Sequence, residues 1–295
     1  MFGGRVGGTR SQMSRYPNQL DTSLDWLFGD GSDGDVTISS NTTLTFRPYY
    51  NSLTVNAGFT LFWQGFIFVR NLLTLAGTIS VAGNNAVGSV GGGASNVGEF
   101  RKHDGGNGGT GVGSGGQAST AIIAASPVCA GSAGGAGSSG AGGAGGAVTD
   151  SNTRIRDPIS AIVALSQILS STNKAAVRFS SGSGGGGGGG DGVNAGGGGG
   201  GGASLLVIVA REIVWSGAGI ITAAGGNGAN AAAGNAGGGG GGGGGVIILV
   251  RRGISPATLI AGTHYSVAGG QKGNGIGTGV NGTLGNDGLF TNIAV

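Results

Sequence analysis

Three runs of consecutive glycine constrain the fold of this chain more than any other feature. They occupy residues 184–190, 196–202 and 237–245. Glycine loses more backbone entropy on ordering than any other residue, so an ordered glycine run needs a compensating set of hydrogen bonds. A flexible linker usually mixes glycine with Ser, Thr or charged residues, whereas these tracts contain almost nothing but Gly, Ala and Asn. We therefore predict that the glycine is itself structural.

Polyproline II is the conformation that suits such a run. It has no internal hydrogen bonds, so every backbone N–H and C=O is available to a neighbour. Glycine chains lack Cβ atoms and can approach closely enough to bond to one another. The sequence therefore predicts packed polyglycine II helices, in which residues 237–245 would span about 28 Å at roughly 3.1 Å per residue.

A repeated strand pattern accompanies the glycine runs. An aliphatic strand ends in Arg and is followed by a short second strand, then by Ala-Gly and a Gly- and Asn-rich tract. Three copies begin at Gly65, Leu205 and Val246, and the third carries an insertion of about four residues. Arginine occupies one matching position in the three copies and glycine occupies another. The arginines are Arg70, Arg211 and Arg251, and the glycines are Gly83, Gly225 and Gly269.

Short β-branched runs separated by turn residues begin at Val36, and two of them, LTVNAGFTL and LTLAGTISV, lie 20 residues apart. A fixed period of this length is typical of stacked β-solenoid rungs. We predict an all-β fold with β-solenoid-like rungs, or a sandwich, combined with packed polyglycine II helices. One short α-helix insertion is expected near 158–170, because Asp157 can cap it and Pro158 suits its first position.

Four segments follow from these patterns. Residues 1–35 form an N-terminal attachment segment and residues 36–100 a β-rung domain. Residues 101–183 form a Gly/Ala-rich insertion that contains the expected helix, and residues 184–295 form a repeat domain of strands and polyglycine.

Catalytic and cofactor sites are not expected. The 12 acidic residues include one tight group, Asp30, Asp33 and Asp35, and the two histidines and one cysteine make no zinc ligand set. GxGxxG matches are expected by chance in a chain with 75 glycines, and no P-loop motif occurs. GDGSDGD has oxygens for Ca²⁺ but lacks the ligand order of an EF-hand, so a polar turn is the favoured interpretation. We predict no enzyme, no cofactor and no resident metal.

Charge and hydropathy limit the classes of partner that the sequence predicts. The 15 Lys and Arg residues are spread over 295 positions for a net charge of +3, and nucleic-acid binding is not predicted because it needs clustered cations. The N-terminus lacks the apolar segment of a secretory signal, and no apolar run is long enough to span a bilayer. Cys129 is expected to be a buried apolar residue and not a nucleophile.

Two groups of side chains are candidates for contact with partners. Flat aromatic faces suit sugar rings, which makes Tyr49, Tyr50 and Tyr265, with His264 beside it, candidates for receptor contact. A short apolar patch in the N-terminal segment suggests docking onto a larger particle, and its members are Leu24, Trp26, Leu27 and Phe28.

The stretch GDGSDGDVTISSNTTLTFRPYYNSLTVNAGFTL, with its continuation LLTLAGTIS, resembles a segment of glycine-rich tail-fibre and receptor-binding proteins of tailed bacteriophages. That resemblance covers roughly residues 29–90. The later mixture of strands and polyglycine looks like the tip adhesins of T-even-like phages, which display variable loops from a sandwich of polyglycine II helices. The helix expected near 158–170 and the β-rungs of this chain depart from that pattern.

The resemblance implies a virion structural protein, a tail-fibre or spike component that contributes to host-surface recognition. It would be made in the host cytoplasm, released by lysis and assembled as a homo-oligomer, with a trimer favoured. Its partners would be other virion proteins and a bacterial surface glycan or outer-membrane protein. Two alternatives are a capsid decoration or head-fibre protein with a purely structural role, and an ice-binding protein of the polyglycine type.

Overall fold

The fold is built from strands and extended segments. The computed structural model describes residues 27–93, 103–113, 119–121, 129–150 and 182–295, and its helical content in these ranges is one short 3₁₀ turn at 27–28. The prediction of an all-β fold is confirmed, whereas the helix expected near 158–170 lies outside the described residues. The strands are β1 (Asp35–Ile38), β2 (Thr42–Thr43), β3 (Tyr49–Tyr50), β4 (Ser52–Val55), β5 (Thr60–Phe62), β6 (Gly65–Leu75), β7 (Thr78–Ser80), β8 (Ser119–Ala121), β9 (Val148–Asp150), β10 (Leu205–Trp215), β11 (Ile220–Thr222), β12 (Val246–Ser255), β13 (Tyr265–Ser266) and β14 (Leu289–Ala294).

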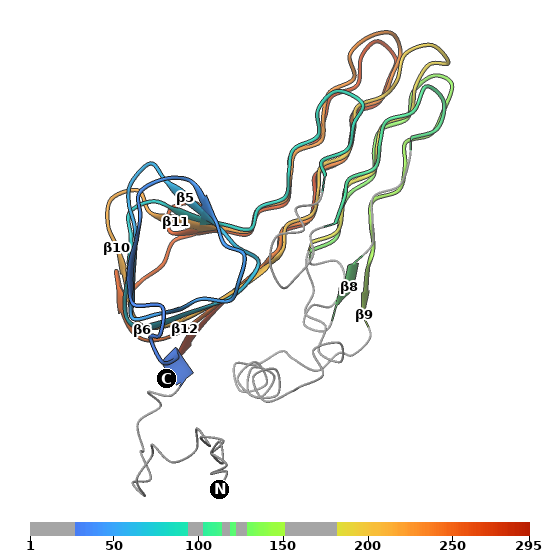
Figure 1. Cartoon of the computed structure of the whole chain (residues 1–295). Coiled ribbons are helices and arrows are strands. Elements are labelled where there is room, and N and C mark those ends of the chain that lie inside the picture. The colour runs from blue at the N-terminus through green and yellow to red at the C-terminus, as the bar shows by residue number, and fades with distance from the viewer. Residues whose placement is uncertain (1–26, 94–102, 114–118, 122–128, 151–181) are drawn as a thin grey trace, which may run out of the picture.

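Two parallel sheets contain nearly all of these strands. The seven-stranded first sheet has the order β1-β4-β6-β10-β12-β14, with β3 also paired to β6, and the five-stranded second sheet has the order β13-β11-β7-β5-β2. Strands β8 and β9 pair separately. Viewed along the stack, the two sheets follow a roughly triangular outline, because β6, β10 and β12 bend through a corner (Figure 1).

The register of the first sheet matches the sequence repeats. Leu53 pairs with Leu73, as the 20-residue spacing predicts, and β10 lies between β6 and β12. One detail differs from the sequence alignment. Arg251 pairs with Ala210, and Gly253 pairs with Glu212, so the residue opposite Arg211 is Arg252. The sequence alignment matched Arg211 to the first residue of the pair Arg251-Arg252, whereas the continuous register of β10 and β12 brings the second one opposite it.

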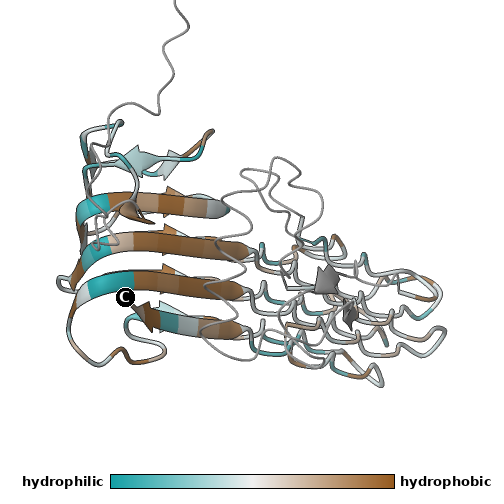
Figure 2. Ribbon diagram, turned by 90° about the horizontal axis from the view of Figure 1, so that it is seen from below, coloured by the Kyte–Doolittle hydropathy of each residue, from teal (hydrophilic) through white to brown (hydrophobic). Residues whose placement is uncertain are grey.

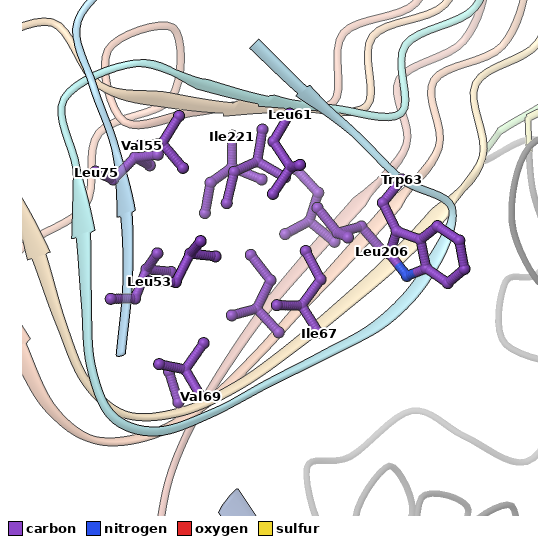
Figure 3. Packing of buried hydrophobic residues seen from close by; sticks show 14 of the residues in the cluster. Leu53, Val55, Leu61, Trp63, Ile67, Val69, Leu75, Leu206 and Ile221 are labelled. Carbon is purple, nitrogen blue, oxygen red and sulfur yellow. The ribbon is translucent and has the colours of Figure 1, made fainter. Parts of the chain in front are cut away.

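The hydrophobic core lies inside the triangular outline, where side chains from both sheets meet (Figure 3). Ile67, Leu206 and Ile208 point into it and are fully buried. The alternate residues of the same strands, such as Phe66 and Val207, are equally buried on the opposite face. Burial of both faces explains the near-continuous aliphatic runs of β6, β10 and β12, since a parallel sheet covered on two sides has no polar face.

Glycine-rich hairpins leave the sheets at one corner. Each hairpin is a pair of extended arms joined by a tight tip, and the hairpins run side by side away from the strands (Figures 1 and 2). Residues 223–245 connect β11 to β12, and residues 267–288 connect β13 to β14. At the equivalent corner between β5 and β6 there is no hairpin. The chain turns over Trp63 and Gln64, and the indole Nε1 of Trp63 donates to the carbonyl of Phe66 at 3.0 Å.

The predicted segments 36–100 and 184–295 share one sheet. β6 belongs to the first segment and β10 to the second, and the two strands pair along most of their length. The boundaries drawn from composition therefore do not separate two cores.

Candidate functional site

The hairpins form a bundle in which successive glycines bond to different neighbours. In the arm 237–245 the backbone N–H of Gly240 donates to Gly186 at 2.8 Å, that of Gly241 to Thr283 at 3.0 Å, and that of Gly242 to Gly226 at 2.9 Å. The same three directions return three residues later, where Gly243 donates to Ser183. A period of three residues is the period of polyproline II.

The interior of this bundle has no room for side chains. The glycine runs 184–190, 196–202 and 237–245 are buried throughout. A Cβ built on Gly240 would overlap the carbonyl oxygen of Ser132, and one on Gly241 would overlap that of Gly270. The pure glycine composition of the runs follows, because each residue of a central arm faces one neighbouring backbone or another.

Arms on the outside of the bundle need glycine only on their inward face. Along the arm 223–232 the residues Asn227 and Asn230 are exposed, whereas Gly226 is buried. These asparagines tie adjacent arms together. The backbone N–H of Asn227 donates to Oδ1 of Asn85 at 2.8 Å, and Oδ1 of Asn227 accepts from the N–H of Gln271 at 2.8 Å. The Asn content of the tracts is thus explained by side-chain amides that bond to the next arm.

A polar cluster holds the hairpin tips in register. The carboxylate of Asp191 accepts from the N–H groups of Val193, Asn194 and Asn235 at 2.7–3.0 Å. The hydrogen bond from Asn194 is the largest cause that lowers the pKa of Asp191 far below its ordinary value. Asn235 in turn accepts from the N–H groups of Thr278 at 3.0 Å and Ser138 at 2.9 Å. We call these residues, which link the tips of four hairpins, the tip clasp.

Exposed aliphatic side chains gather at the same end of the bundle. Val193 is 83% exposed and Val112 is 68% exposed, and both lie in tips that connect glycine arms. The ends of the hairpins farthest from the sheets carry short stretches of both hydrophobic and hydrophilic colour (Figure 2). We define the tip surface as the exposed aliphatic residues Val112, Val193, Ile276 and Val280. It is the candidate functional site, since it combines exposed apolar groups with a rigid support.

The aromatic candidates lie on the strands and their turns and not on the tips. Tyr49 stacks on Phe68 at 5.0 Å between ring centroids, and Tyr50 is 4% exposed, so its ring is not presented to a ligand. Tyr265 stacks on Phe290 at 3.7 Å. The imidazole Nδ1 of His264 accepts from the N–H of Ile260 at 3.0 Å. Receptor contact by these residues stays a prediction.

The N-terminal candidates lie partly inside the fold. Phe28 is buried against the outer face of the first sheet, and Leu27 packs beside it, whereas Leu24 and Trp26 lie outside the described residues. The three aspartates are used locally: Asp30 accepts from Ser32, Asp33 from Tyr49 and Asp35 from Asn51. In the described ranges no group of three or more His, Cys, Asp or Glu side chains is placed to hold a metal ion.

Sequence reasoning missed the tip surface and the tip clasp. A signal was present, since Val112 and Val193 are isolated aliphatic residues in tracts of Gly, Asn and Ala. No protein-family model, curated protein or solved structure matches the chain. Within the ranges that the structure describes, no helix has the length and apolar character needed to cross a membrane.

Proposed function

We propose that the stacked strands are a β-solenoid and that the hairpins are a bundle of packed polyglycine II helices inserted at one corner of it. Parallel pairing of matching repeats along both sheets supports the first part. Donation by Gly240, Gly241 and Gly242 in three successive directions supports the second. The bundle then acts as a rigid arm that is held together by backbone hydrogen bonds between its glycine runs and by side-chain amides between its outer arms.

We further propose that the chain is a structural protein of a tailed-phage particle, a tail-fibre or spike component that contacts the host surface. The observation that carries this proposal is the tip surface. Exposed valines and an isoleucine lie at the end of a bundle that has no core of side chains, so they do not serve to pack the bundle. Contiguous exposed apolar groups on a protein generally mark an interaction site.

Rigidity of the tips favours binding over a purely structural role. The tip clasp fixes the backbone on which Val193 and Ile276 stand, through Asp191 and Asn235. A pre-ordered surface loses little conformational entropy when a partner binds. Virion location, and attachment through the N-terminal segment, are parts of the same proposal.

Adsorption to bacterial cells tests the proposal. Fluorescently labelled protein is mixed with a panel of bacterial strains, and bound protein is measured by flow cytometry against concentration. We expect saturable binding to a subset of strains. Val193→Ser together with Ile276→Ser should reduce it at least tenfold, because apolar anchors in a small interface each contribute on the order of 1–2 kcal/mol.

Leu284→Ser is the matched control. Leu284 is an exposed aliphatic residue, like Val193 and Ile276, with 54% of its surface accessible, but it lies on an arm and not at a tip. Equal loss of adsorption in the control and the tip variant would contradict a specific tip surface, and so would the absence of binding to every strain tested. Antibody labelling of particles decides the location, since label on the capsid shell instead of the tail would contradict a tail-fibre or spike role.

A further inference from the structure

A column of arginines crosses the first sheet at the corner where its long strands bend. β6, β10 and β12 each begin with at least five buried residues and then become more exposed, at 70–71, 211–212 and 251–252. The hydrophilic band at this bend is visible on successive strands (Figure 2). We define the basic column as Arg70, Arg211, Arg251 and Arg252.

The register places these arginines in adjacent strands. Arg252 lies opposite Arg211, and Arg70 lies beside the register shift that Arg211 occupies. Neighbouring strands are about 4.8 Å apart, so the column extends roughly 10 Å along the stack between its first and last strands. The sequence repeat, which has an arginine after each aliphatic run, has therefore produced a row of like charges at the bend of the long strands.

The positive charge of this surface is concentrated on β10 and β12. At the β6 end, Asp30 accepts at its backbone carbonyl from Nη1 of Arg70 at 3.1 Å, and Asp35 is linked to Asn71, the neighbour of Arg70, through the side chain of Asn51. On β10 and β12, Arg211, Arg251 and Arg252 accompany one acidic residue of these strands, Glu212, whose side chain lies over Gly253. Three guanidinium groups against one carboxylate leave a positive excess on these two strands.

Local contacts hold the guanidinium groups in place. Nε of Arg251 donates to Oδ1 of Asn292 at 3.0 Å, and the guanidinium of Arg252 lies 5.6 Å from the ring centroid of Phe28. A guanidinium carries five N–H donors in a planar fork, so it can keep local contacts of this kind and also donate to a ligand. Held in this way, arginine is suited to paired hydrogen bonds with carboxylate, sulfate or phosphate groups.

We propose that the basic column binds an anionic polysaccharide that runs along the stack of strands. A row of guanidinium groups matches a polymer that carries an acidic group on successive sugars. Nucleic acid fits less well, because a specific interface with it buries about 1,000–2,500 Å² and uses many more cations. The exposed residues at the bends of β6 and β10 are Arg, Asn and Glu, with no aromatic ring for base stacking.

This site is separate from the tip surface and does not depend on the function proposed above. It lies on the strands, whereas the tip surface lies at the far end of the hairpins. A chain that failed to adsorb to cells through its tips would still be expected to bind a charged glycan at the column.

Binding of dextran sulfate to the full chain tests the proposal, measured by biolayer interferometry at several salt concentrations. Neutral dextran of the same length and a DNA duplex are the comparison ligands. We expect dextran sulfate to bind with an affinity that falls as salt rises, since exposed charges are screened. Arg211→Gln with Arg252→Gln should weaken binding roughly tenfold, because each exposed charge contact contributes a few-fold.

Lys272→Gln is the matched control for Arg211→Gln. Lys272 is exposed on a hairpin arm, so its removal changes the net charge equally at a distance from the column. An unchanged affinity for the control with a several-fold loss for Arg211→Gln supports the site, provided that both variants keep the wild-type melting temperature. Equal losses in the two variants, equal binding of neutral dextran, or tighter binding of DNA through the same arginines would each overturn it. Failure of the arginine variant to fold is resolved with Arg211→Lys, which keeps the charge and should retain most of the affinity.

Discussion

Substitution of one central glycine by alanine tests whether close backbone approach holds the bundle together. Gly240 donates to Gly186 and accepts from Gly200, and a Cβ at this position would overlap the carbonyl of Ser132. The obstacle is backbone and not a flexible side chain. Gly240→Ala can therefore be accommodated only if the arm that contains Ser132 moves away.

The cost of that movement follows from the bonds it breaks. The arm donates to the central run through Ser132 to Gly241 at 3.0 Å and through Gly135 to Gly238 at 2.8 Å. Two backbone hydrogen bonds contribute about 2 kcal/mol net, and crowding in a packed interior adds about 1 kcal/mol or more. A Gly-to-Ala change also lowers the conformational entropy of the unfolded chain, which stabilises the folded state by about 0.4–1 kcal/mol and offsets part of this loss. The expected loss is about 2 kcal/mol, or roughly 4–8 °C in the melting temperature for a chain of a few hundred residues.

Gly111→Ala is the control, because a Cβ at Gly111 would have no atom within 4 Å. Thermal unfolding followed by circular dichroism gives the two melting temperatures, and amide hydrogen exchange shows where the structure opens. We expect the control to melt within about 2 °C of the wild type. Equal melting temperatures for Gly240→Ala and Gly111→Ala would refute the tight packing of the central arms.

Three further predictions concern the thiol, the tip clasp and the core. Burial raises the pKa of Cys129 to about 12, so iodoacetamide should label the native chain slowly at pH 8 and completely in denaturant; rapid native labelling would contradict its burial. Asp191→Ala should accelerate exchange of the Asn194 amide while the glycine runs stay protected. Hydrogen bonds lower the pKa of Asp191. The stabilisation that its carboxylate gives the tip clasp is therefore complete above the ordinary pKa of 3.8 and is lost only as the pH falls through the lowered pKa. The NMR signal of the wild-type Asn194 amide should accordingly keep its position down to pH 3. Ile208 is fully buried, so Ile208→Ala should lower the free energy of unfolding by about 2–5 kcal/mol in denaturant titrations. Ile260 is 55% exposed, so Ile260→Ala should change the same free energy by less than about 0.5 kcal/mol.

The repeats could be found in the sequence because they consist of recurring side chains that the fold buries. Aliphatic runs such as Leu205–Ala210 are buried on both faces of a parallel sheet, and residues like Gly83, Gly225 and Gly269 recur where stacked arms begin. Gly83 donates to Ala224 and Gly225 donates to Ala268, which places the three glycines in adjacent layers as the alignment predicts.

The arrangement of the bundle could not be found in this way. A glycine run carries no side-chain pattern, so nothing in 237–245 distinguishes the neighbour of Gly240 from that of Gly241. The clasp is also hidden from sequence, because Asp191 and Asn235 are 44 residues apart and meet only when two hairpins lie side by side. The sequence also left open which of the two consecutive arginines, Arg251 or Arg252, lies opposite Arg211, because residue type alone does not decide between them, whereas the register of β10 and β12 does.

Hydrogen exchange of the glycine amides tests the central claim most directly. In the native chain the amides of 184–190, 196–202 and 237–245 lie in a buried bundle, and those of Gly240, Gly241 and Gly242 each donate to a different arm. Mass spectrometry of peptides from these runs should show protection comparable to that of β10, with fast exchange confined to exposed tip residues such as Ala232 and Ala233. Rapid exchange throughout the three runs would mean that the glycine arms are not bonded to one another, and the account of a rigid bundle would be wrong.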